Sequence, residues 1–138
     1  MSLLDLSRSE VAYLEMIYRL NETHETTSVS ALAKKFGVRL PSAIEILSRL
    51  EKKGLVTKKP WRTPELSKRG AELAESVMHQ HRILELYLNK KLGLGSELSC
   101  AQASKIDYLL DGAVVERMCK VLNRPSRCLH GNPIRHGD

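Results

Sequence analysis

The sequence has few aromatic residues and no long run of apolar residues. Phe, Trp and Tyr together make up 4% of the 138 residues, which argues against an aromatic-rich β-sandwich and favours helices packed through aliphatic side chains. No apolar stretch approaches the roughly 20 residues that a membrane-spanning helix needs. The N-terminal segment contains Asp5 and Glu10 and lacks the layout of a signal peptide. We therefore expect a cytoplasmic protein that has no membrane segment.

The cysteines do not form a disulfide framework. Cys100, Cys119 and Cys128 are an odd and widely spaced set in a chain without a secretory signal, so reduced thiols are expected. A glycine-rich phosphate loop and a nucleophile elbow are also absent from the sequence. We predict that the chain is not an enzyme and has no small organic substrate. The enzymatic alternative is a small hydrolase that uses His81, Glu85 and Cys100.

Positive charge is concentrated in one segment of the chain. The formal net charge is +6, and residues 34–69 alone hold 11 basic and 3 acidic residues, a net charge of +8. Residues 1–33 carry a net charge of −3 and residues 70–138 a net charge of +1. A cationic segment of this kind is either a solvated surface or a binding site for a polyanion. The local structure has to decide between the two.

Capping residues and glycines predict a clear order of elements. They indicate helices over about 8–21, 28–36 and 42–53, a hairpin over 55–67, and a long helix over 68–92. Ser99 and Asp111 are predicted to cap two further helices, which precede a loop-like tail. Helix, helix, turn, helix, hairpin is the order of a winged helix–turn–helix. We predict a mainly α protein with a small β-hairpin, with a winged helix–turn–helix domain over residues 1–70 and a helical domain over residues 71–138.

Double-stranded DNA is the polyanion that this order predicts, because the second helix of the motif enters the major groove and the wing contacts the neighbouring backbone. Base reading is expected from the first turn of that helix: Arg39, Pro41, Ser42 and Glu45. Glu45 is better explained by an ion pair with Arg49, four residues later. The remaining basic residues are predicted phosphate contacts: Lys34, Lys35, Arg49, Lys52, Lys53, Lys58, Lys59 and Arg62. Trp61 packs either on the duplex or against the body of the domain.

A polar pair interrupts the apolar stripe of the long helix. His81 and Glu85 share its inner face, and a His and a Glu four residues apart direct two ligand atoms to one point, which suits a divalent metal ion. The alternative is a hydrogen-bonded His81–Glu85 pair, or a salt bridge to Arg82 or Arg117. Cys100 is predicted in the first turn of the next helix, where the helix dipole favours a thiolate. It offers a third ligand or a site of oxidation.

The C-terminal tail contains further residues of ligand type. Cys128, His130 and His136 could each bind a metal ion, but a disordered tail is the expectation from the sequence. Cys119 lies beside the predicted core face of the last helix and is interpreted as a small buried hydrophobic residue.

Five segments of the chain resemble a known family: Glu-Lys-Lys-Gly-Leu-Val at 51–56, Leu-Ser-Lys-Arg-Gly at 66–70, His-Arg-Ile-Leu-Glu at 81–85, Val-Glu-Arg-Met at 115–118 and Cys-Leu-His-Gly-Asn-Pro-Ile at 128–134. They resemble the diphtheria-toxin-repressor family of metal-dependent transcriptional repressors, which includes the iron-dependent and manganese-transport regulators. The resemblance implies a winged helix–turn–helix joined to a helical dimerisation and metal-binding domain. It also implies a homodimeric repressor of metal-homeostasis genes that binds a palindromic operator. Longer members continue into an SH3-like third domain, so the chain looks like a two-domain form.

The resemblance also assigns metal ligands. His81 and Glu85 match two family ligands, and Cys100 falls where iron regulators place a His. Asp107 replaces a Glu and Glu15 matches an acidic position of the manganese branch, so both could ligate. Three positions of the second ligand set differ from the family, which has Met or Asp, Cys or Glu, and His there: Ala12, Ser104 and Tyr108. A site with a thiolate favours Fe(II), Zn(II), Co(II) or Ni(II) over Mn(II). The alternative function is a winged-helix DNA-binding regulator that is independent of metal or that responds to oxidation, with Cys100 as the candidate thiol.

Overall fold

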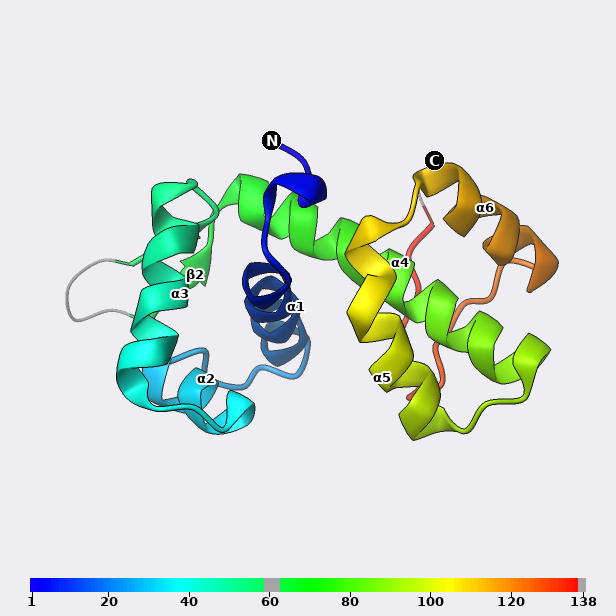
Figure 1. Cartoon of the computed structure of the whole chain (residues 1–138), viewed down its shortest axis with the longest axis horizontal. Coiled ribbons are helices and arrows are strands. Elements are labelled where there is room, and N and C mark those ends of the chain that lie inside the picture. The colour runs from blue at the N-terminus through cyan, green and yellow to red at the C-terminus, as the bar shows by residue number, and fades with distance from the viewer. Residues whose placement is uncertain (59–62, 137–138) are drawn as a thin grey trace. The chain divides into compact units, whose positions relative to one another are not determined.

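The computed structural model describes residues 1–58 and 63–136 and divides the chain into two units, Met1–Glu75 and Ser76–Asp138. The first unit contains the predicted helices and hairpin (Figure 1). Its elements are η1 (Leu3–Asp5), α1 (Arg8–Glu22), α2 (Val29–Phe36), α3 (Leu40–Lys52), β1 (Val56–Thr57), β2 (Glu65–Leu66) and the start of α4 (Lys68–Leu92). The two strands pair antiparallel, with Val56 opposite Leu66. The prediction of a mainly helical fold with a small hairpin is confirmed.

The predicted capping residues begin and end the helices of the first unit. At the start of α1 the Ser7 hydroxyl accepts a hydrogen bond from the Glu10 amide, and the Glu10 carboxylate accepts one from the Ser7 amide. Ser28 caps α2 by accepting from the Ala31 amide. Gly37 ends α2 with φ at +64°, a conformation that glycine adopts without steric cost. These local signals set where the helices of the helix–turn–helix begin and end.

Aliphatic side chains form the core of the first unit. Leu14 and Ile17 of α1, Leu32 of α2, and Leu47 and Leu50 of α3 are fully buried, and α3 packs against both α1 and α2. Burial of these side chains from three helices is the main source of stability that holds α3 in a fixed orientation. The packing of α3 against α1 and α2 therefore fixes the direction in which its outer face points.

The second unit contains the rest of α4 with two further helices and the tail (Figure 1). Its elements after α4 are α5 (Ser96–Ile106), η2 (Asp107–Leu109) and α6 (Gly112–Val121). A buried cluster joins α4, α6 and the tail through Ile83, Leu86, Val115, Cys119, Cys128 and Ile134. Among residues 1–58 and 63–136, no helix combines the length and the apolar character that a membrane crossing requires.

The start of α5 differs from the sequence prediction. Ser99 was expected to cap this helix, but α5 begins at Ser96, after Gly95. Ser99 lies inside the helix, where its hydroxyl donates to the Leu94 carbonyl at 3.3 Å and is buried. A Ser inside a helix satisfies its hydroxyl on a backbone carbonyl, and sequence spacing alone does not distinguish this from a cap.

Candidate metal centre and nucleic-acid interface

His81 lies on α4 and is held by a buried carboxylate. Its Nδ1 lies 3.0 Å from Oδ2 of Asp107, and both side chains are at most 1% exposed. Because a carboxylate accepts hydrogen bonds, this contact favours the tautomer with the proton on Nδ1 and a lone pair on Nε2. The Gln80 side chain donates to the backbone carbonyls of Asp107 and Leu110 at 2.5 and 3.3 Å, which fixes the segment that carries Asp107.

Two further ligand-type atoms face Nε2 of His81. Oε2 of Glu85 lies 3.4 Å from it and Sγ of Cys100 lies 3.5 Å from it. A tetrahedral zinc site with ordinary bond lengths separates nitrogen from oxygen by about 3.4 Å and nitrogen from sulfur by about 3.6 Å. His81 and Glu85 are buried and Cys100 is half-buried. The predicted set His81, Glu85 and Cys100 thus comes together with the spacing that a metal ion requires.

Glu85 also contributes to a second group of ligand-type residues. Its other oxygen, Oε1, lies 3.7 Å from Nδ1 of His130. Atoms of Glu85, Cys128 and His130 lie within 4.8 Å of one another, with Glu85 and Cys128 buried and His130 exposed. The two carboxylate oxygens of Glu85 therefore face two different groups of imidazole and thiol side chains. The thiol of the first group, Cys100, comes from α5, and the thiol of the second group, Cys128, comes from the tail.

The expectation of a disordered tail is wrong up to His136. Arg82 is buried and donates to the Pro133 carbonyl at 3.0 Å. The Cys128 amide donates to the Asn132 carbonyl at 2.9 Å, closing a turn in which Gly131 has φ at +80°. Ile134 anchors this turn in the apolar cluster. Gly131 and Ile134 were the available signals in the sequence, a turn residue followed by a buried aliphatic residue.

The remaining predicted ligands take different positions. Asp107 follows α5 and contacts Nδ1 of His81, so it is placed to orient the imidazole. Glu15 is buried on α1 in the first unit. Cys100 lies in the second turn of α5 and not in its first turn. The prediction that Cys100 lies in the first turn of this helix is therefore wrong, and His81 is the polar group beside it.

The predicted base-reading residues lie at the start of α3. Arg39 is the N-cap residue, and Arg39, Pro41 and Ser42 are all exposed. Glu45 pairs with Arg49 at 2.7 Å, which confirms the ion-pair interpretation of Glu45. At the surface these two charges compensate each other, so neither needs DNA as a partner.

Apart from Arg49 and Lys53, the predicted phosphate contacts fall into three groups. Lys34 and Lys35 are exposed in the last turn of α2, and Lys52 is exposed at the end of α3. Lys58 is half-buried just after β1. Lys59 and Arg62 lie outside the described residues, and so does Trp61, which is predicted to pack on the duplex or against the body of the domain. The positive charge that surrounds α3 is therefore carried by exposed side chains from at least two helices.

Lys53 differs from the other basic residues of this segment. Its Nζ donates to Oε1 of Glu10 at 2.8 Å and to the Asp5 carbonyl at 3.2 Å. Burial alone would raise the pKa of Glu10. The hydrogen bonds from Lys53 and from the Ser7 amide outweigh this effect, so the pKa of Glu10 is lowered. Lys53 thus neutralises a buried carboxylate and ties η1 to the end of α3.

A helix–turn–helix with a hairpin, followed by a helical unit that contains a buried imidazole and carboxylate and a half-buried thiol, is the arrangement expected of metal-dependent DNA-binding regulators. The comparisons with known proteins agree with this class. The chain belongs to the iron-dependent repressor family: residues 5–63 match its N-terminal DNA binding domain, and residues 67–136 match its metal binding and dimerisation domain.

Curated relatives and solved structures share this likeness. The iron-dependent repressor IdeR of Mycobacterium tuberculosis is 34% identical over 122 residues, which cover 88% of this chain and 53% of IdeR. The diphtheria toxin repressor of Corynebacterium diphtheriae is 31% identical over 130 residues, 94% of this chain and 58% of that repressor. The chain thus spans somewhat more than half the length of these relatives.

Two solved structures extend the comparison. The manganese regulator SloR is 32% identical with a TM-score of 0.83, over 94% of this chain and 60% of SloR. A hypothetical protein from Sulfolobus solfataricus is 30% identical with a TM-score of 0.71, over 95% of this chain and the whole of that protein.

Proposed function

We propose that this chain is a cytoplasmic, homodimeric, metal-responsive repressor that binds a palindromic DNA operator. Membership of the iron-dependent repressor family supports this proposal, as do the exposed basic residues around α3. The observation that carries the metal response is the position of His81 Nε2, 3.4 Å from a carboxylate oxygen and 3.5 Å from a thiol sulfur. We take residues 1–70 as the DNA-binding domain and residues 71–138 as the dimerisation and metal-binding domain.

In the DNA-binding unit, Arg39, Pro41 and Ser42 contact base edges from the first turn of α3. An Arg side chain recognises guanine through two hydrogen bonds, and a proline ring contacts a thymine methyl group. Three exposed lysines and the half-buried Lys58 fix the protein on the phosphate backbone and supply most of the salt-dependent affinity. The three exposed lysines are Lys34, Lys35 and Lys52. Arg49 is a weaker candidate because it already pairs with Glu45, and for Lys59 and Arg62 the proposal rests on their charge alone.

In the metal-binding unit, His81, Glu85 and Cys100 hold the metal ion, and Asp107 orients His81. A bound divalent cation supplies positive charge and coordinate bonds that compensate the buried carboxylate and thiolate. Cys128 and His130 are additional donors on the other oxygen of Glu85. The repressor responds to metal only to the extent that one arrangement of the dimer binds the ion better than another.

The donor set favours Fe(II), Zn(II), Co(II) or Ni(II) over Mn(II). Thiolate and imidazole are softer ligands than the carboxylates and carbonyls that suit manganese. Named relatives include both an iron-dependent repressor and a manganese regulator, so the choice in this chain depends on its own donors. Cys100 is the residue on which this preference rests.

Titration calorimetry of chelator-treated protein with Fe(II), Zn(II), Co(II) and Mn(II) tests the metal site. We expect Glu85→Gln and Cys100→Ser to weaken Zn(II) binding by at least about tenfold, because each removes a charged ligand. The matched control Glu97→Gln, an exposed carboxylate of α5, should bind like the wild type. Isotherms that are identical for the wild type and His81→Ala would contradict the metal site.

One contact also supports a thiol-based response. Cys100 Sγ lies 3.5 Å from His81 Nε2, and the residue is only half-buried and thus partly accessible to an oxidant. Peroxide treatment followed by a DNA-binding assay separates the two responses. If Cys100 is the oxidation sensor, the Cys100→Ser variant loses the peroxide effect, and Cys119→Ser keeps it because Cys119 is fully buried.

A further inference from the structure

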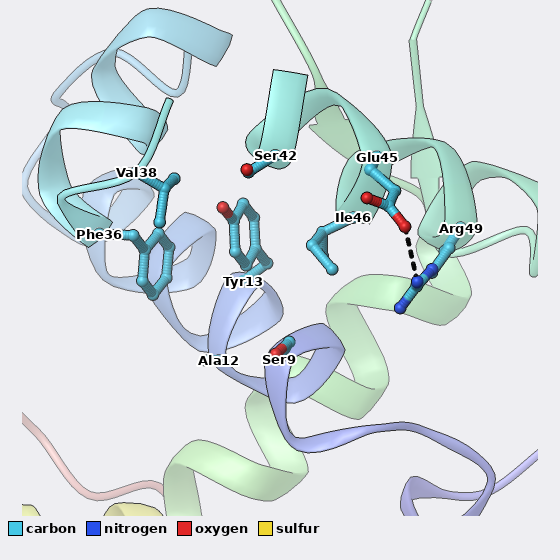
Figure 2. A pocket seen from close by; sticks show the side chains of 9 residues that line it. All are labelled: Ser9, Ala12, Tyr13, Phe36, Val38, Ser42, Glu45, Ile46 and Arg49. Atoms are coloured by element: carbon cyan, nitrogen blue, oxygen red, sulfur yellow. Dashed lines mark hydrogen bonds and ion pairs between the residues drawn. The ribbon is translucent and has the colours of Figure 1, made fainter. Parts of the chain in front are cut away.

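A cavity of about 320 Å³ lies inside the first unit, between α1, the turn after α2 and α3 (Figure 2). None of the candidate metal ligands lines it. Its volume falls at the lower end of the roughly 300–1,000 Å³ of small-molecule sites in proteins. The cavity is thus large enough for an organic molecule of one or two rings and lies in the unit that carries the proposed DNA contacts.

The cavity wall is predominantly apolar and partly aromatic. Tyr13 and Phe36 stack with their ring centroids 4.2 Å apart and their planes 10° apart. Phe36 and Ile46 are only half-buried and Val38 is 40% exposed, so this concave surface leaves apolar area in contact with water. Figure 2 shows Phe36 and Val38 on one side of the Tyr13 ring and Ile46 on the other. A flat apolar ligand would cover this area and add contacts between aromatic rings.

The polar groups of the cavity favour an uncharged ligand. Ser9 of α1 and Ser42 of α3 contribute hydroxyl groups to the lining, which can donate or accept hydrogen bonds. The charged residues Glu45 and Arg49 also line it, but they pair with each other at 2.7 Å. Because the two charges compensate each other, neither is left over as a partner for a charged group on a ligand. A neutral molecule with one hydrogen-bonding group needs no such partner.

We propose that this cavity binds a small, planar, uncharged aromatic molecule, and that the bound molecule weakens DNA binding by α3. The second part rests on the proposed function, because Ser42 belongs both to the cavity lining and to the proposed base-reading turn. The ligand competes with DNA for this side chain. The resulting control of DNA binding is independent of metal, because the lining contains no proposed metal ligand.

Indole is a suitable probe, with benzoate and benzylamine as charged aromatic molecules of similar size. We expect indole to shift the amide NMR signals of Ser9, Ala12 and Val38 in the full chain, saturating with a Kd on the order of 1 mM or lower. The charged probes should bind at least about fivefold more weakly, because they meet the Glu45–Arg49 pair. Shifts that do not saturate, or that spread over the whole surface, would overturn the proposal.

Two variants locate the site. Ala12→Phe fills the cavity and should weaken indole binding by about tenfold or more, whereas Ala31→Phe, at a half-buried alanine outside the lining, should bind indole like the wild type. Thermal unfolding verifies that each variant folds. If Ala12→Phe does not fold, Val38→Glu places a charge on the exposed part of the apolar wall and should weaken binding in the same way. Unchanged binding in a folded Ala12→Phe or Val38→Glu variant would overturn the proposal.

Fluorescence anisotropy with a mixed-sequence DNA duplex tests the coupling. Saturating indole should lower the DNA affinity of the wild type by at least about threefold, both with and without Zn(II). The DNA affinity of the Ala12→Phe variant should be the same with and without indole. Indole binding without any change in DNA affinity would contradict the coupling. A chain that binds indole at this site but binds no DNA would contradict the proposed function and still support the ligand site.

Discussion

Oδ2 of Asp107 lies 3.0 Å from Nδ1 of His81, and both side chains are buried. This contact separates the two nitrogens of the imidazole by role, because one is held by Asp107 and the other faces Glu85 and Cys100. Carboxylates that orient a ligating histidine from its far side are common at metal sites and raise the basicity of the ligand. We propose that Asp107 positions His81 and does not itself bind the metal ion.

The role of Asp107 is testable with two substitutions. Asp107→Asn keeps an oxygen that accepts from Nδ1, so we expect Zn(II) affinity to fall only a few-fold. Asp107→Ala removes the acceptor and should lower the affinity by about 10–100-fold, the range measured for such orienting partners. Competition with a chromogenic chelator measures both values, and circular dichroism verifies the fold. Equal, large losses in both variants would instead identify Asp107 as a ligand.

The basic residues of α2 provide a test of the DNA interface through salt dependence. Each phosphate contact adds about 0.9 to the slope of log affinity against log salt concentration. We therefore expect Lys34→Ala and Lys35→Ala each to reduce that slope by about 0.9. Lys105→Ala, an exposed lysine of α5 in the second unit, is the matched control and should leave the slope unchanged. Anisotropy titrations at several salt concentrations measure the slopes, and slopes equal to that of the wild type would exclude these contacts.

Local sequence signals predicted the first unit well because its elements are fixed by contacts over three or four residues. The Ser7 and Ser28 caps and the left-handed Gly37 all occur as expected. The Glu45–Arg49 pair, four residues apart on one helix, is also confirmed. Such features depend only on the geometry of one helix, so residue types and their spacing in the sequence are enough to predict them.

Contacts between distant segments could not be read from the sequence. Arg82 holds the tail through the Pro133 carbonyl, 51 residues later, and so brings Cys128 and His130 towards Glu85. Lys53 pairs with Glu10, 43 residues earlier, although its position in a cationic run suggested a phosphate contact. For both Arg82 and Lys53 the sequence suggests a partner nearby in the chain or at the surface. Only the tertiary fold shows the distant acceptor to which each side chain donates its hydrogen bond.

The Lys53–Glu10 pair should make stability depend on pH. The pKa of Glu10 is lowered in the folded protein from its model-compound value of 4.5, so the pair stabilises the fold above that value. Its contribution is lost as the pH falls through the lowered pKa and Glu10 is protonated. We expect Lys53→Met to reduce the free energy of unfolding at pH 7 by about 1–2 kcal/mol, the range for a hydrogen bond to a charged group with one partly exposed partner.

Urea unfolding at a series of pH values measures this effect. The difference between the wild type and Lys53→Met should be largest at neutral pH and should shrink below pH 4.5. Lys52→Met is the matched control, because Lys52 is exposed and adjacent in sequence, and it should lose little stability at any pH. A difference that stays constant down to strongly acidic pH would assign the effect of Lys53 to its aliphatic chain or to its contact with the Asp5 carbonyl.

Gly70 in the first turn of α4 allows a close approach between this helix and the residue before β1. A Cβ atom at this position would overlap the backbone carbonyl oxygen of Leu55, whereas a Cβ at Gly112, in the first turn of α6, would meet nothing within 4 Å. Backbone atoms cannot rotate away as a side chain can, so Gly70→Ala should destabilise the chain by about 1–3 kcal/mol. Gly112→Ala should be neutral or stabilise it by up to about 1 kcal/mol, because alanine favours the helix. Thermal unfolding compares the two variants, and equal melting temperatures would show that α4 moves away from Leu55 without loss.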